Sequence, residues 1–494
     1  MKLFSASQIR EIDQATIENE PISSIDLVER AASTCSDWII EAYDHSVSFH
    51  VFCGMGNNGA DGLAIARHLA LAGYSVQVFA IAHRSSGTSN FTRNIERLAE
   101  VKLDVHYVNA KKEMPEVDET AVAIDAILGI GLDKPLRGIL KDVVQAIQEG
   151  YDHVISIDVP TGLPSDLDST IKLSECVEAT HTLTFQFPKL SFMVAGLGEY
   201  TGDVHVMDIG LDEEKIHDID TPYHLTTGYD VVGIRQDRKA FSHKGDYGHA
   251  LIAAGHKGML GAAVLATKAC LRSGAGLVTT HIPSMGCDVL QISAPEAMVQ
   301  LDHSETSITS IPIPKRITAV GIGPGLGREK SSFNALTALL EDVQVPLLID
   351  ADALHLMSIT DSWSKLPANS VLTPHAGEFH TMTGVEFGDS ISRLEAARRW
   401  AKDHHCIVLL KGAYSAICDS SGNVYFNGSG HPAMAAGGSG DVLSGLITGL
   451  LAQGIAPLKA AILGAWLHGR AGEEVAIDRG EHAVVASDLI DYLS

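Results

Sequence analysis

The chain has 494 residues, more than one hydrophobic core usually holds, so we expect two domains. Its 36 basic and 61 acidic residues give a formal net charge of −25, which argues against nucleic acid or an anionic membrane as a partner. The sequence contains no C-x-x-C pair, no apolar stretch of transmembrane length and no signal peptide. We therefore expect a soluble cytoplasmic protein whose seven cysteines are reduced and mostly buried.

The first half of the chain alternates apolar runs with helical patterns. Runs such as "SVSFHVFCGMG", "AVAIDAILG" and "HVISIDVPTG" end at glycine, aspartate or proline, as the strands of βαβ units do. Before them, Ile25, Val28, Ala32, Cys35 and Ile39 recur at three-and-four spacing, which predicts an amphipathic helix packed on the sheet. The pattern predicts a Rossmann-like α/β domain with a mainly parallel sheet.

A polar segment with little periodicity follows "YTGDVHVMDIGL" and separates the two halves. We place the domain boundary near Thr221, which gives domains of residues 1–220 and 221–494. The second half repeats the α/β rhythm with different loops, and no sequence repeat links it to the first. The sequence thus predicts two unrelated α/β domains.

The segment "VFCGMGNNGADGLAIARHL" is an apolar run, a glycine-rich turn and a helix expected from about Leu63. Its glycines allow close approach of a ligand, and the helix N-terminus can bind a phosphate. A plain strand-to-helix turn would need the glycines alone. Because Asn57, Asn58 and Asp61 are not required for such a turn, we favour a ligand site.

Two further strand ends carry acidic residues. Asp125 precedes a glycine-containing loop, and Asp158 precedes Pro160. On its own, Asp125 is equally consistent with a helix cap. Ligands of open parallel sheets collect at the carboxyl ends of the strands, so three such ends in one domain predict a shared cleft.

The second half carries a similar set of strand ends. "GIGPGLGRE" is a glycine-rich turn, and "LLIDADALHLM" places Asp350 and Asp352 where carboxylates can orient a hydroxyl or hold a metal. "LTPHAGEF" contributes His375, and "LLKGAYSAI" contributes Lys411 beside a small-residue turn. Taken singly, Asp350 is typical of a cap and His375 of a hydrogen-bonded structural histidine. Their occurrence together favours a binding site.

The stretch "AAGGSGDVLSG" has two interpretations. It can be a tight turn into a buried helix. It can also be a phosphate cradle, in which Gly437, Gly438 and Gly440 direct N–H groups at a transferring phosphoryl group while Asp441 takes a proton from the acceptor. The neighbouring strand-end motifs favour the cradle.

These motifs resemble those of known families. "HKGDYGHALIAAG", "GPGLG", "DADAL", "LTPHAGE", "LKGAYS" and "GGSGDVLSG" resemble, in order, those of the NAD(P)H-hydrate dehydratases of the ribokinase-like superfamily. "GNNGADGL", "ARHLA", "DAILGIGL" and "DVPTGL" are similar to the NAD(P)H-hydrate epimerases. The domain order resembles that of the fused prokaryotic repair enzymes, and the two resemblances cover nearly the whole chain.

The resemblance implies repair of NADH and NADPH to which water has added across a ring double bond. The epimerase domain would interconvert the R and S hydrates. The dehydratase domain would transfer a phosphoryl group from ADP, with magnesium, to the hydroxyl of the S hydrate and eliminate phosphate, leaving AMP. It also implies that the partners are small molecules, and we expect a homo-oligomer.

For the epimerase domain, the resemblance implies that Asp158 lies near the reacting ring. It also implies these substrate-binding residues: Asn57, Asn58, Gly59, Ala60, Asp61, Gly129, Ile130, Gly131, Leu132, Asp133, Lys134, Pro135 and Asp158. The implied potassium ligands are Asn58, Asp125 and Thr161, whose oxygens suit a hard cation. Ala60 replaces a usual glycine, which requires a negative φ at this position.

For the dehydratase domain, the resemblance implies that Asp441 is the base that deprotonates the hydroxyl. The implied hydrate-binding residues are Ala263, Gly325, His375 and Asp441. The implied nucleotide-binding residues are Lys411, Gly412, Ala413, Tyr414, Ser415 and Gly440.

Two alternatives remain from the sequence. The C-terminal half could be a small-molecule kinase of the same superfamily, such as a vitamin-precursor kinase, fused to a nucleotide-binding module without chemistry. The N-terminal half could also be a protein-interaction or regulatory module. A kinase would leave a stable phosphorylated product, whereas a dehydratase would release phosphate and restore the nicotinamide.

Overall fold

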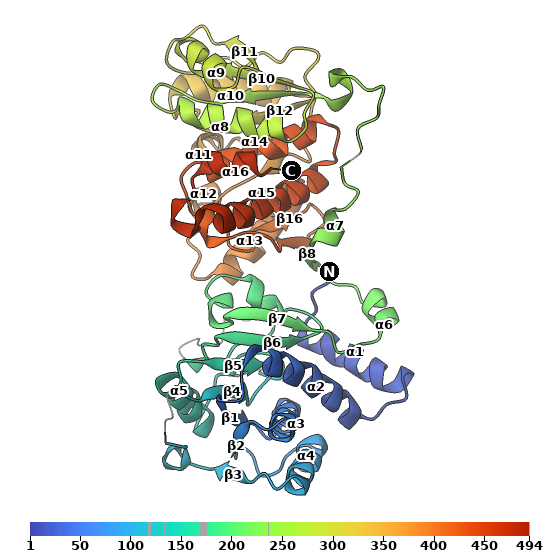
Figure 1. Ribbon diagram of the computed structural model, residues 1–494. Helices are drawn as coiled ribbons and strands as arrows, with labels where there is room; N and C mark the ends of the chain where they lie inside the picture. The colour runs from blue at the N-terminus through green and yellow to red at the C-terminus, as the bar shows by residue number, and fades with distance from the viewer. Residues whose placement is uncertain (117–119, 133, 168–174, 236, 494) are drawn as a thin grey trace. The chain divides into compact units, whose positions relative to one another are not determined.

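The computed structural model describes the chain except for residues 117–119, 133, 168–174, 236 and 494 (Figure 1). It divides into two compact units. The N-terminal unit comprises Lys2–Thr221 and Asp389–Ile391, and the C-terminal unit comprises Met1, Pro222–Gly388 and Ser392–Ser494. Each unit has its own sheet and its own hydrophobic core, so the expected two-domain α/β architecture is confirmed.

The N-terminal unit has a seven-stranded sheet in the order β3-β2-β1-β4-β5-β6-β7, and all its described pairings are parallel. Its strands are β1 (Ser48–Cys53), β2 (Ser75–Ile81), β3 (Val105–Val108), β4 (Val122–Ala126), β5 (Val154–Ile157), β6 (His181–Phe185) and β7 (Asp203–Met207). Its helices are α1 (Ala6–Asn19), α2 (Ser24–Ala42), α3 (Asn57–Leu71), α4 (Ser89–Glu100), α5 (Ile139–Gly150) and α6 (Glu213–Asp218). The strand order reverses between β1 and β4, the point at which such sheets bind ligands.

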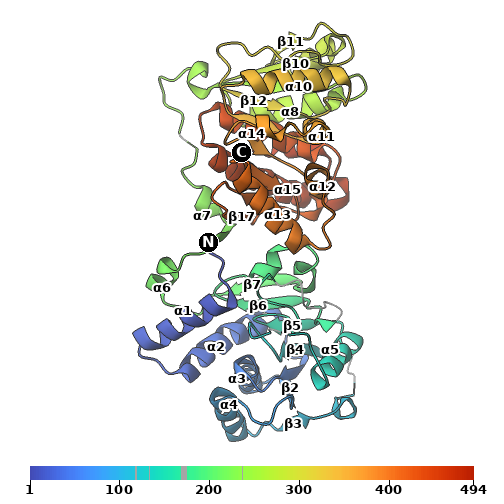
Figure 2. The same cartoon turned by 180° about the vertical axis from the view of Figure 1, so that it is seen from behind.

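The apolar run of β1 is buried on both faces of the sheet. Phe49, Val51 and Cys53 belong to the core formed with α1–α4, whereas Phe52 belongs to the core formed with α5. Because alternate residues of a strand face opposite sides, a run that is apolar throughout requires helices on both faces. Figures 1 and 2 show α5 on one side of this sheet and α2–α4 on the other.

The glycine-rich segment after β1 becomes helical earlier than the sequence predicted. We expected a turn up to about Leu63, but α3 begins at Asn57. The reason is close packing: a Cβ atom at Gly59 would lie 1.6 Å from the carbonyl oxygen of Gly54, so glycine is required inside the helix. Ala60 lies in α3 outside the positive-φ region and is fully buried, as the sequence required.

The C-terminal unit has a ten-stranded mixed sheet in the order β11-β10-β9-β12-β13-β14-β15-β16-β17-β8, antiparallel only where β16 pairs with β15 and β17 among the described pairings. Its strands are β8 (Tyr223–Thr226), β9 (His249–Ala253), β10 (Leu277–Ile282), β11 (Met298–Leu301), β12 (Ala319–Ile322), β13 (Leu347–Ile349), β14 (Val371–Leu372), β15 (Ile407–Leu410), β16 (Ala416–Cys418) and β17 (Val424–Asn427). Its helices are α7 (Gly228–Val231), α8 (Leu260–Arg272), α9 (Cys287–Ser293), α10 (Lys330–Asp342), α11 (Ala351–Thr360), α12 (Ala376–Thr383), α13 (Ser390–Asp403), α14 (Ser439–Ala452), α15 (Pro457–Arg479) and α16 (Ala486–Asp491).

Helices α8, α14, α15 and α16 form one continuous core with this sheet. Seen from behind in Figure 2, α10 and α13 are in front. The backbones of helices α14 and α8 are in close contact. A Cβ atom at Gly445 would lie 2.0 Å from the carbonyl oxygen of Ala266. Gly449 repeats the contact one turn later, where a Cβ atom would lie 1.9 Å from Oγ of Ser273. The glycines of α14 therefore fix the position of its N-terminus.

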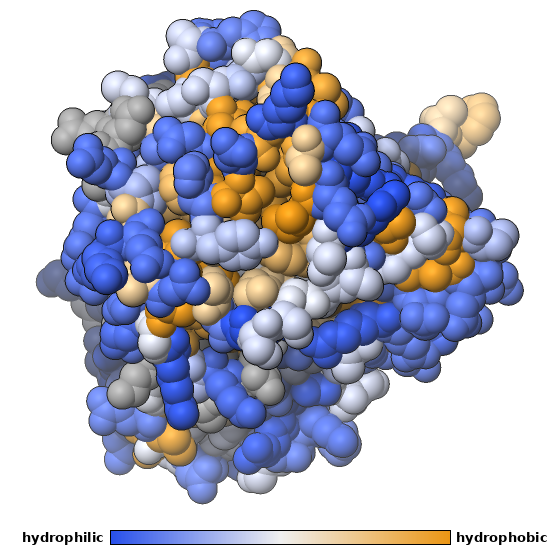
Figure 3. Space-filling model, turned by 90° about the horizontal axis from the view of Figure 1, so that it is seen from below, coloured by the Kyte–Doolittle hydropathy of each residue, from blue (hydrophilic) through white to orange (hydrophobic). Residues whose placement is uncertain are grey.

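Other expectations from the sequence agree with the fold. Val28, Ala32, Cys35 and Ile39 are buried on α2, as the periodicity predicted, and Ile25 is half-buried. The seven cysteines are all free, and six are buried. Within the described residues, no helix is long and apolar enough to cross a membrane. The face seen from below is mostly hydrophilic, with hydrophobic side chains gathered near its middle (Figure 3).

The contact between α14 and α8 gives a stability prediction. We expect Gly445→Ala to lower the free energy of unfolding of the C-terminal unit by about 3 kcal/mol, because the added methyl group forces the two helices apart. Differential scanning calorimetry would measure the change. Gly261→Ala, in the first turn of α8, has no heavy atom within 4 Å of the new methyl group and should leave the transition nearly unchanged. Equal transitions for the two variants would contradict the packing account.

Candidate active sites

Asp125 is fully buried near the end of β4. Its carboxylate accepts hydrogen bonds from N and Oγ1 of Thr161 (2.8 and 2.7 Å), Oγ of Ser156 (2.9 Å) and N of Ile127 (3.3 Å). Burial raises its pKa, while these hydrogen bonds act in the opposite direction. Asp125 is therefore not simply a helix cap: it joins β4 to β5 and to the loop that follows β5.

The side chain of Asn58 lies close to this region. Both polar atoms of its amide are buried without a hydrogen-bond partner in the described part of the chain. Such orphaned groups are rare, and they call for a partner that is missing from the protein atoms. The oxygens of Asn58, Asp125 and Thr161 are the hard donors that an alkali cation accepts, so the residues present fit the potassium ion implied by the resemblance.

A cavity of about 280 Å³ lies beside these strand ends. Four predicted residues line it: Asn57, Asp61, Ile130 and Asp158. Three charged residues that the sequence did not single out also line it: Arg10, Asp13 and Lys189. The cavity thus combines the predicted strand ends with α1 and with the segment after β6.

Asp158 follows β5 with a φ of +66°, an uncommon conformation for a non-glycine residue. Its Oδ1 lies 2.8 Å from Nζ of Lys189, and the Lys189 side chain is 1% exposed. Nζ also donates to Oγ1 of Thr184 (2.9 Å) and to the carbonyl oxygens of Phe185 (3.2 Å) and Phe187 (3.0 Å). These bonds hold the lysine in place, so Asp158 has a fixed partner for its charge.

Two other carboxyl groups of the cavity carry raised pKa values. Burial, and then the charge of Asp158, raise the pKa of Asp13 to about 6, against lowering effects of Lys189 and Arg10. Burial also raises the pKa of Asp61 well above its usual value, with further contributions from Asp158 and Asp13. Both carboxyl groups therefore lose their protons less readily than an ordinary aspartate.

The remaining predicted epimerase residues have other surroundings. Gly59 and Ala60 are packed inside α3, and Gly129 is adjacent to Asn58 and Asp158: a Cβ atom on Gly129 would lie 3.3 Å from Cγ of Asn58 and 3.1 Å from Oδ2 of Asp158. Four predicted loop residues do not line the cavity: Gly131, Leu132, Lys134 and Pro135. Asp133 lies outside the described residues.

In the C-terminal unit, the buried Asp350 forms an ion pair with the partly exposed Lys411. Oδ1 of Asp350 lies 2.8 Å from Nζ of Lys411, and Oδ2 accepts a hydrogen bond from Oγ of Ser444 at 2.5 Å. Asp350 occupies the N-cap position of α11, but its side chain, which is 1% exposed, makes no capping hydrogen bond there. Asp352 instead binds the glycine turn, through N of Gly327 (3.1 Å) and Nε of Arg328 (2.8 Å).

The stretch "AAGGSGDVLSG" has the turn expected from the sequence, and the phosphate cradle stays a prediction that its surroundings favour. It is a turn into a buried helix, with Gly438 at φ +91° immediately before α14. It also places the N-terminus of α14 beside Lys411: a Cβ atom at Gly440 would lie 3.1 Å from the lysine Nζ. A helix N-terminus next to a fixed ammonium group is suited to bind an anion.

Asp441 lies in the first turn of α14. Burial, and then the nearby charge of Asp350, raise its pKa to about 6, with smaller raising effects from Asp352 and Glu378 and a lowering effect from Lys411. A carboxylate with this pKa is ionised at neutral pH and remains a better base than an ordinary aspartate.

The other predicted dehydratase residues lie at the start of α12, in the glycine turn after β12 and on α8. His375 caps α12: its Nδ1 accepts from N of Gly377 (3.0 Å) and Glu378 (3.2 Å), so the structural interpretation of this histidine is confirmed, while its ring remains 59% exposed. Gly325 has a φ of +55°, and its carbonyl oxygen is 2.9 Å from Nδ1 of His256. Ala263 is buried on α8.

The segment Lys411–Ser415 forms a turn after β15. Oγ of Ser415 donates to the carbonyl oxygen of Gly412 (3.1 Å), which closes the turn, and Ala413 and Tyr414 are exposed. The turn can therefore contact a ligand without rearrangement of the core.

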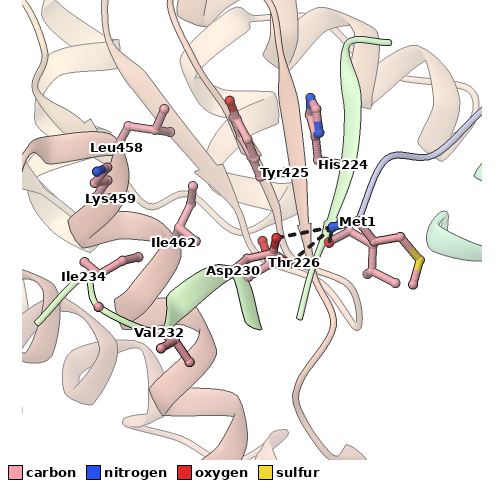
Figure 4. A pocket seen from close by; sticks show the side chains of 12 residues that line it. Met1, His224, Thr226, Asp230, Val232, Ile234, Tyr425, Leu458, Lys459 and Ile462 are labelled. Carbon is pink, nitrogen blue, oxygen red and sulfur yellow. Dashed lines mark hydrogen bonds and ion pairs between the residues drawn. The ribbon is translucent and has the colours of Figure 1, made fainter. Parts of the chain in front are cut away.

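A different pocket of the C-terminal unit holds none of the predicted residues (Figure 4). It has a volume of about 380 Å³ and lies among β8, β17, α7 and α15. In Figure 4 the Met1 amino group points to Asp230, at 3.3 Å, across the end of the pocket.

The sequence missed Asp13, Lys189 and Ser444. Asp13 follows the buried residue Ile12 on α1 and lies one helical turn after Ile9, so an acidic group next to an apolar face was the available signal. Lys189 stands among apolar residues in "FQFPKLSF", which was a comparable signal. Ser444 lies one turn after Gly440 in a helix of small residues and offered no comparable signal.

Known proteins match this chain over its whole length. A family model described as NAD(P)H-hydrate dehydratase matches residues 250–494, and one described as YjeF-related protein N-terminus matches residues 24–191. The bifunctional NAD(P)H-hydrate repair enzyme Nnr of Moorella thermoacetica is 34% identical, over 100% of this chain and 96% of its own. The enzyme of the same name from Thermofilum pendens is 32% identical, over 100% and 95%.

Among solved structures, the ADP/ATP-dependent NAD(P)H-hydrate dehydratase of Bacillus subtilis, co-crystallised with ATP and Mg²⁺, is 31% identical, with a TM-score of 0.49. The match covers 55% of this chain and 96% of that one. Because the family models and full-length relatives match both halves, they favour the repair enzyme over the kinase alternative. The chain belongs to the bifunctional NAD(P)H-hydrate repair enzymes, with an epimerase in its N-terminal half and an NAD(P)H-hydrate dehydratase in its C-terminal half.

Proposed function

We propose that the two clefts act in sequence on hydrated NADH and NADPH, with the epimerase domain formed by residues 1–220 and the dehydratase domain by residues 221–494. The first cleft converts the R hydrate to the S hydrate. The second phosphorylates the S hydrate with ADP, eliminates phosphate and leaves AMP. The observation that carries the second step is the position of Asp441 at the N-terminus of α14, beside the Asp350–Lys411 pair.

In the dehydratase cleft, Asp441 removes the proton of the hydrate hydroxyl as that oxygen attacks the terminal phosphoryl group of ADP. The N–H groups of Gly437, Gly438 and Gly440 stabilise the negative charge that develops on the phosphoryl oxygens. Lys411 lies beside Gly440 and balances charge on the same group. Phosphate then leaves with the hydrate oxygen, because phosphate is a better leaving group than hydroxide.

The substrates occupy the turns that surround Asp441. Ala263, Gly325 and His375 contact the hydrate. The adenine nucleotide is bound by a separate set: Lys411, Gly412, Ala413, Tyr414, Ser415 and Gly440. The exposed turn Lys411–Ser415 supports this assignment, because its outer residues are accessible to a ligand.

Magnesium fits this cleft as the counter-ion of ADP. The negative charges of Asp350, Asp352 and Glu378 all raise the pKa of Asp441, so the cleft is rich in carboxylate oxygen, which magnesium prefers. Asp352 and Glu378 are the side chains that would hold it, and the ion would neutralise charge on the diphosphate.

Asp441→Asn tests the dehydratase assignment. We expect kcat for dehydration of the S hydrate with ADP to fall by about 10²–10⁴-fold, because the amide cannot accept the proton. In the unmodified protein, kcat/KM should rise with pH through about 6, since the base acts when ionised. Nicotinamide absorbance and released phosphate would report both effects.

Epimer exchange in the same Asp441→Asn protein serves as the control for the amount of intact chain, because it takes place in the other domain. It should proceed at the unmodified rate. Near-full dehydratase turnover by this variant would rule out Asp441 as the base.

In the epimerase cleft, we assign Asp158 to the reacting ring. The nucleotide part of the hydrate is bound by the start of α3, with Asn57, Asn58, Gly59, Ala60 and Asp61. It is also bound by the loop of residues 129–135, with Gly129, Ile130, Gly131, Leu132, Asp133, Lys134 and Pro135. Support comes from the cavity, which brings Asn57, Asp61, Ile130 and Asp158 together.

Asn58, Asp125 and Thr161 would hold potassium. The ion would supply a fixed positive charge at the strand ends, beside the substrate loop. The orphaned amide of Asn58 supports this assignment, because a cation would satisfy its buried oxygen.

The potassium site predicts a stability effect that is independent of activity. For a site with a Kd of about 5 mM, about 100 mM potassium should stabilise the N-terminal unit by about 2 kcal/mol over the same concentration of choline. Asn58→Ala should abolish this gain. In choline it should lower the free energy of unfolding only slightly, because the amide it removes has no hydrogen-bond partner in the described part of the chain. Calorimetry with both salts would measure it.

Thr161→Ser is the matched control for the potassium test, since it retains the hydroxyl oxygen and should keep the gain. If potassium stabilised the unmodified protein and Asn58→Ala by the same amount, the proposed potassium site would be wrong.

We also propose that the enzyme is cytoplasmic and forms a homo-oligomer with no nucleic-acid or membrane partner. The seven free cysteines support a reducing compartment, and the net charge of −25 opposes binding to polyanions.

A further inference from the structure

We propose that Asp13 is the proton donor of the epimerase, acting on the hydroxyl oxygen of the hydrate. The proposal rests on the assignment of this cleft as the epimerase site. Asp13 comes from α1, which precedes the matched family segment at residues 24–191, so no matched motif points to it.

Five charged side chains from four parts of the chain line this one cavity. They are Arg10 and Asp13 from α1, Asp61 from α3, Asp158 after β5 and Lys189 after β6. Lys189 is committed to Asp158 by the 2.8 Å ion pair, and the Arg10 guanidinium donates to the carbonyl oxygen of Ile130 at 3.1 Å. Three carboxyl groups therefore share two cations. Because like charges that share a cavity disfavour joint ionisation, the carboxyl groups here lose their protons less readily than isolated ones.

Burial distinguishes the two carboxyl groups of the cavity for which the described residues include no ion-pair partner. Asp61 lies inside the first turns of α3 and is only 7% exposed, and burial raises its pKa well above the usual value. Asp13 is half-buried, and burial raises its pKa to about 6. A group that must release and regain a proton in each cycle works best with a pKa near the working pH and with access to the substrate. Asp13 meets both requirements.

The chemistry needs one proton donor beside one fixed negative charge. Asp13 gives its proton to the hydroxyl oxygen as the C–O bond breaks, and water leaves. The lone pair of the adjacent ring nitrogen forms a C=N bond, so the ring carries a positive charge that the Asp158 carboxylate stabilises. Water then adds to the opposite face of the same carbon, and its surplus proton returns to Asp13 through the carboxyl groups of the cavity. Atoms and charge balance without an oxidant or reductant.

Asp13→Asn tests the proposal with the purified R hydrate as substrate. We expect kcat for appearance of the S hydrate, followed by chromatography and corrected for the rate without protein, to fall by about 10²–10⁴-fold. In the unmodified protein kcat/KM should fall as pH rises above about 6, because the donor acts when protonated, and this fall should vanish in Asp13→Asn. Asp13→Glu should recover part of the rate and the fall with pH.

Glu11→Gln is the matched control. It removes a carboxylate from the same helix, but Glu11 pairs with Lys215 on the surface at 2.5 Å and does not line the cavity. Its exchange rate should equal that of the unmodified protein. Dehydration of the S hydrate by the same chains should be unchanged and reports that equal amounts of intact chain are compared.

A second measurement requires no variant. In water labelled with heavy oxygen, each S hydrate formed from R should carry the label, because its hydroxyl comes from solvent. Retention of the original oxygen would overturn the proposed C–O cleavage. If Asp13→Asn exchanged the epimers at the rate of the unmodified protein and with the same pH profile, Asp13 would not be the proton donor. No exchange above the uncatalysed rate in the unmodified protein would instead contradict the assignment of the cleft.

Discussion

Each candidate site depends on an ion pair between a buried aspartate and a lysine. Asp158 pairs with Lys189 in the N-terminal unit and Asp350 with Lys411 in the C-terminal unit, both at 2.8 Å. Removal of one partner of such a pair typically costs about 3–5 kcal/mol, because an uncompensated charge stays buried. In both pairs the charges are held by further hydrogen bonds, from Lys189 to three oxygens and to Asp350 from Ser444.

The ion pairs also set the behaviour of a neighbouring carboxyl group. The fixed negative charge of Asp158 contributes to the pKa of about 6 at Asp13, and that of Asp350 contributes to the same value at Asp441. In our account each site separates two tasks: one aspartate is held in an ion pair with a lysine, and a second carries the proton. In our account the two proton carriers work in opposite senses, since Asp13 acts as an acid and Asp441 as a base. Loss of a hydroxyl group requires an acid, and attack by a hydroxyl group requires a base.

Much of this arrangement could be predicted from the sequence. The alternation of apolar runs and helical periods predicted the two α/β domains. The carboxyl ends of the strands identified Asp125, Asp158 and Asp350, and the glycine-rich stretch identified Asp441. The predicted start of α3 was wrong, because Gly59 allows the helix to pack against Gly54 and is not part of a turn. This role of Gly59 depends on a residue that is its neighbour in space. Lys189 and Asp13 were missed for a related reason: each joins its site only when segments distant in the chain are brought together.

The central claim, that each domain has its own proton-carrying carboxyl group, is tested most directly by one time course. An equal mixture of R and S hydrates is incubated with the unmodified protein and excess ADP at a series of pH values, and the nicotinamide absorbance is followed. The account predicts two phases that together restore all the nicotinamide. Around pH 6, the fast phase should accelerate with rising pH as Asp441 ionises, and the slow phase should decelerate as Asp13 loses its proton. Recovery that stops at half, or two phases that change with pH in the same direction, would contradict it.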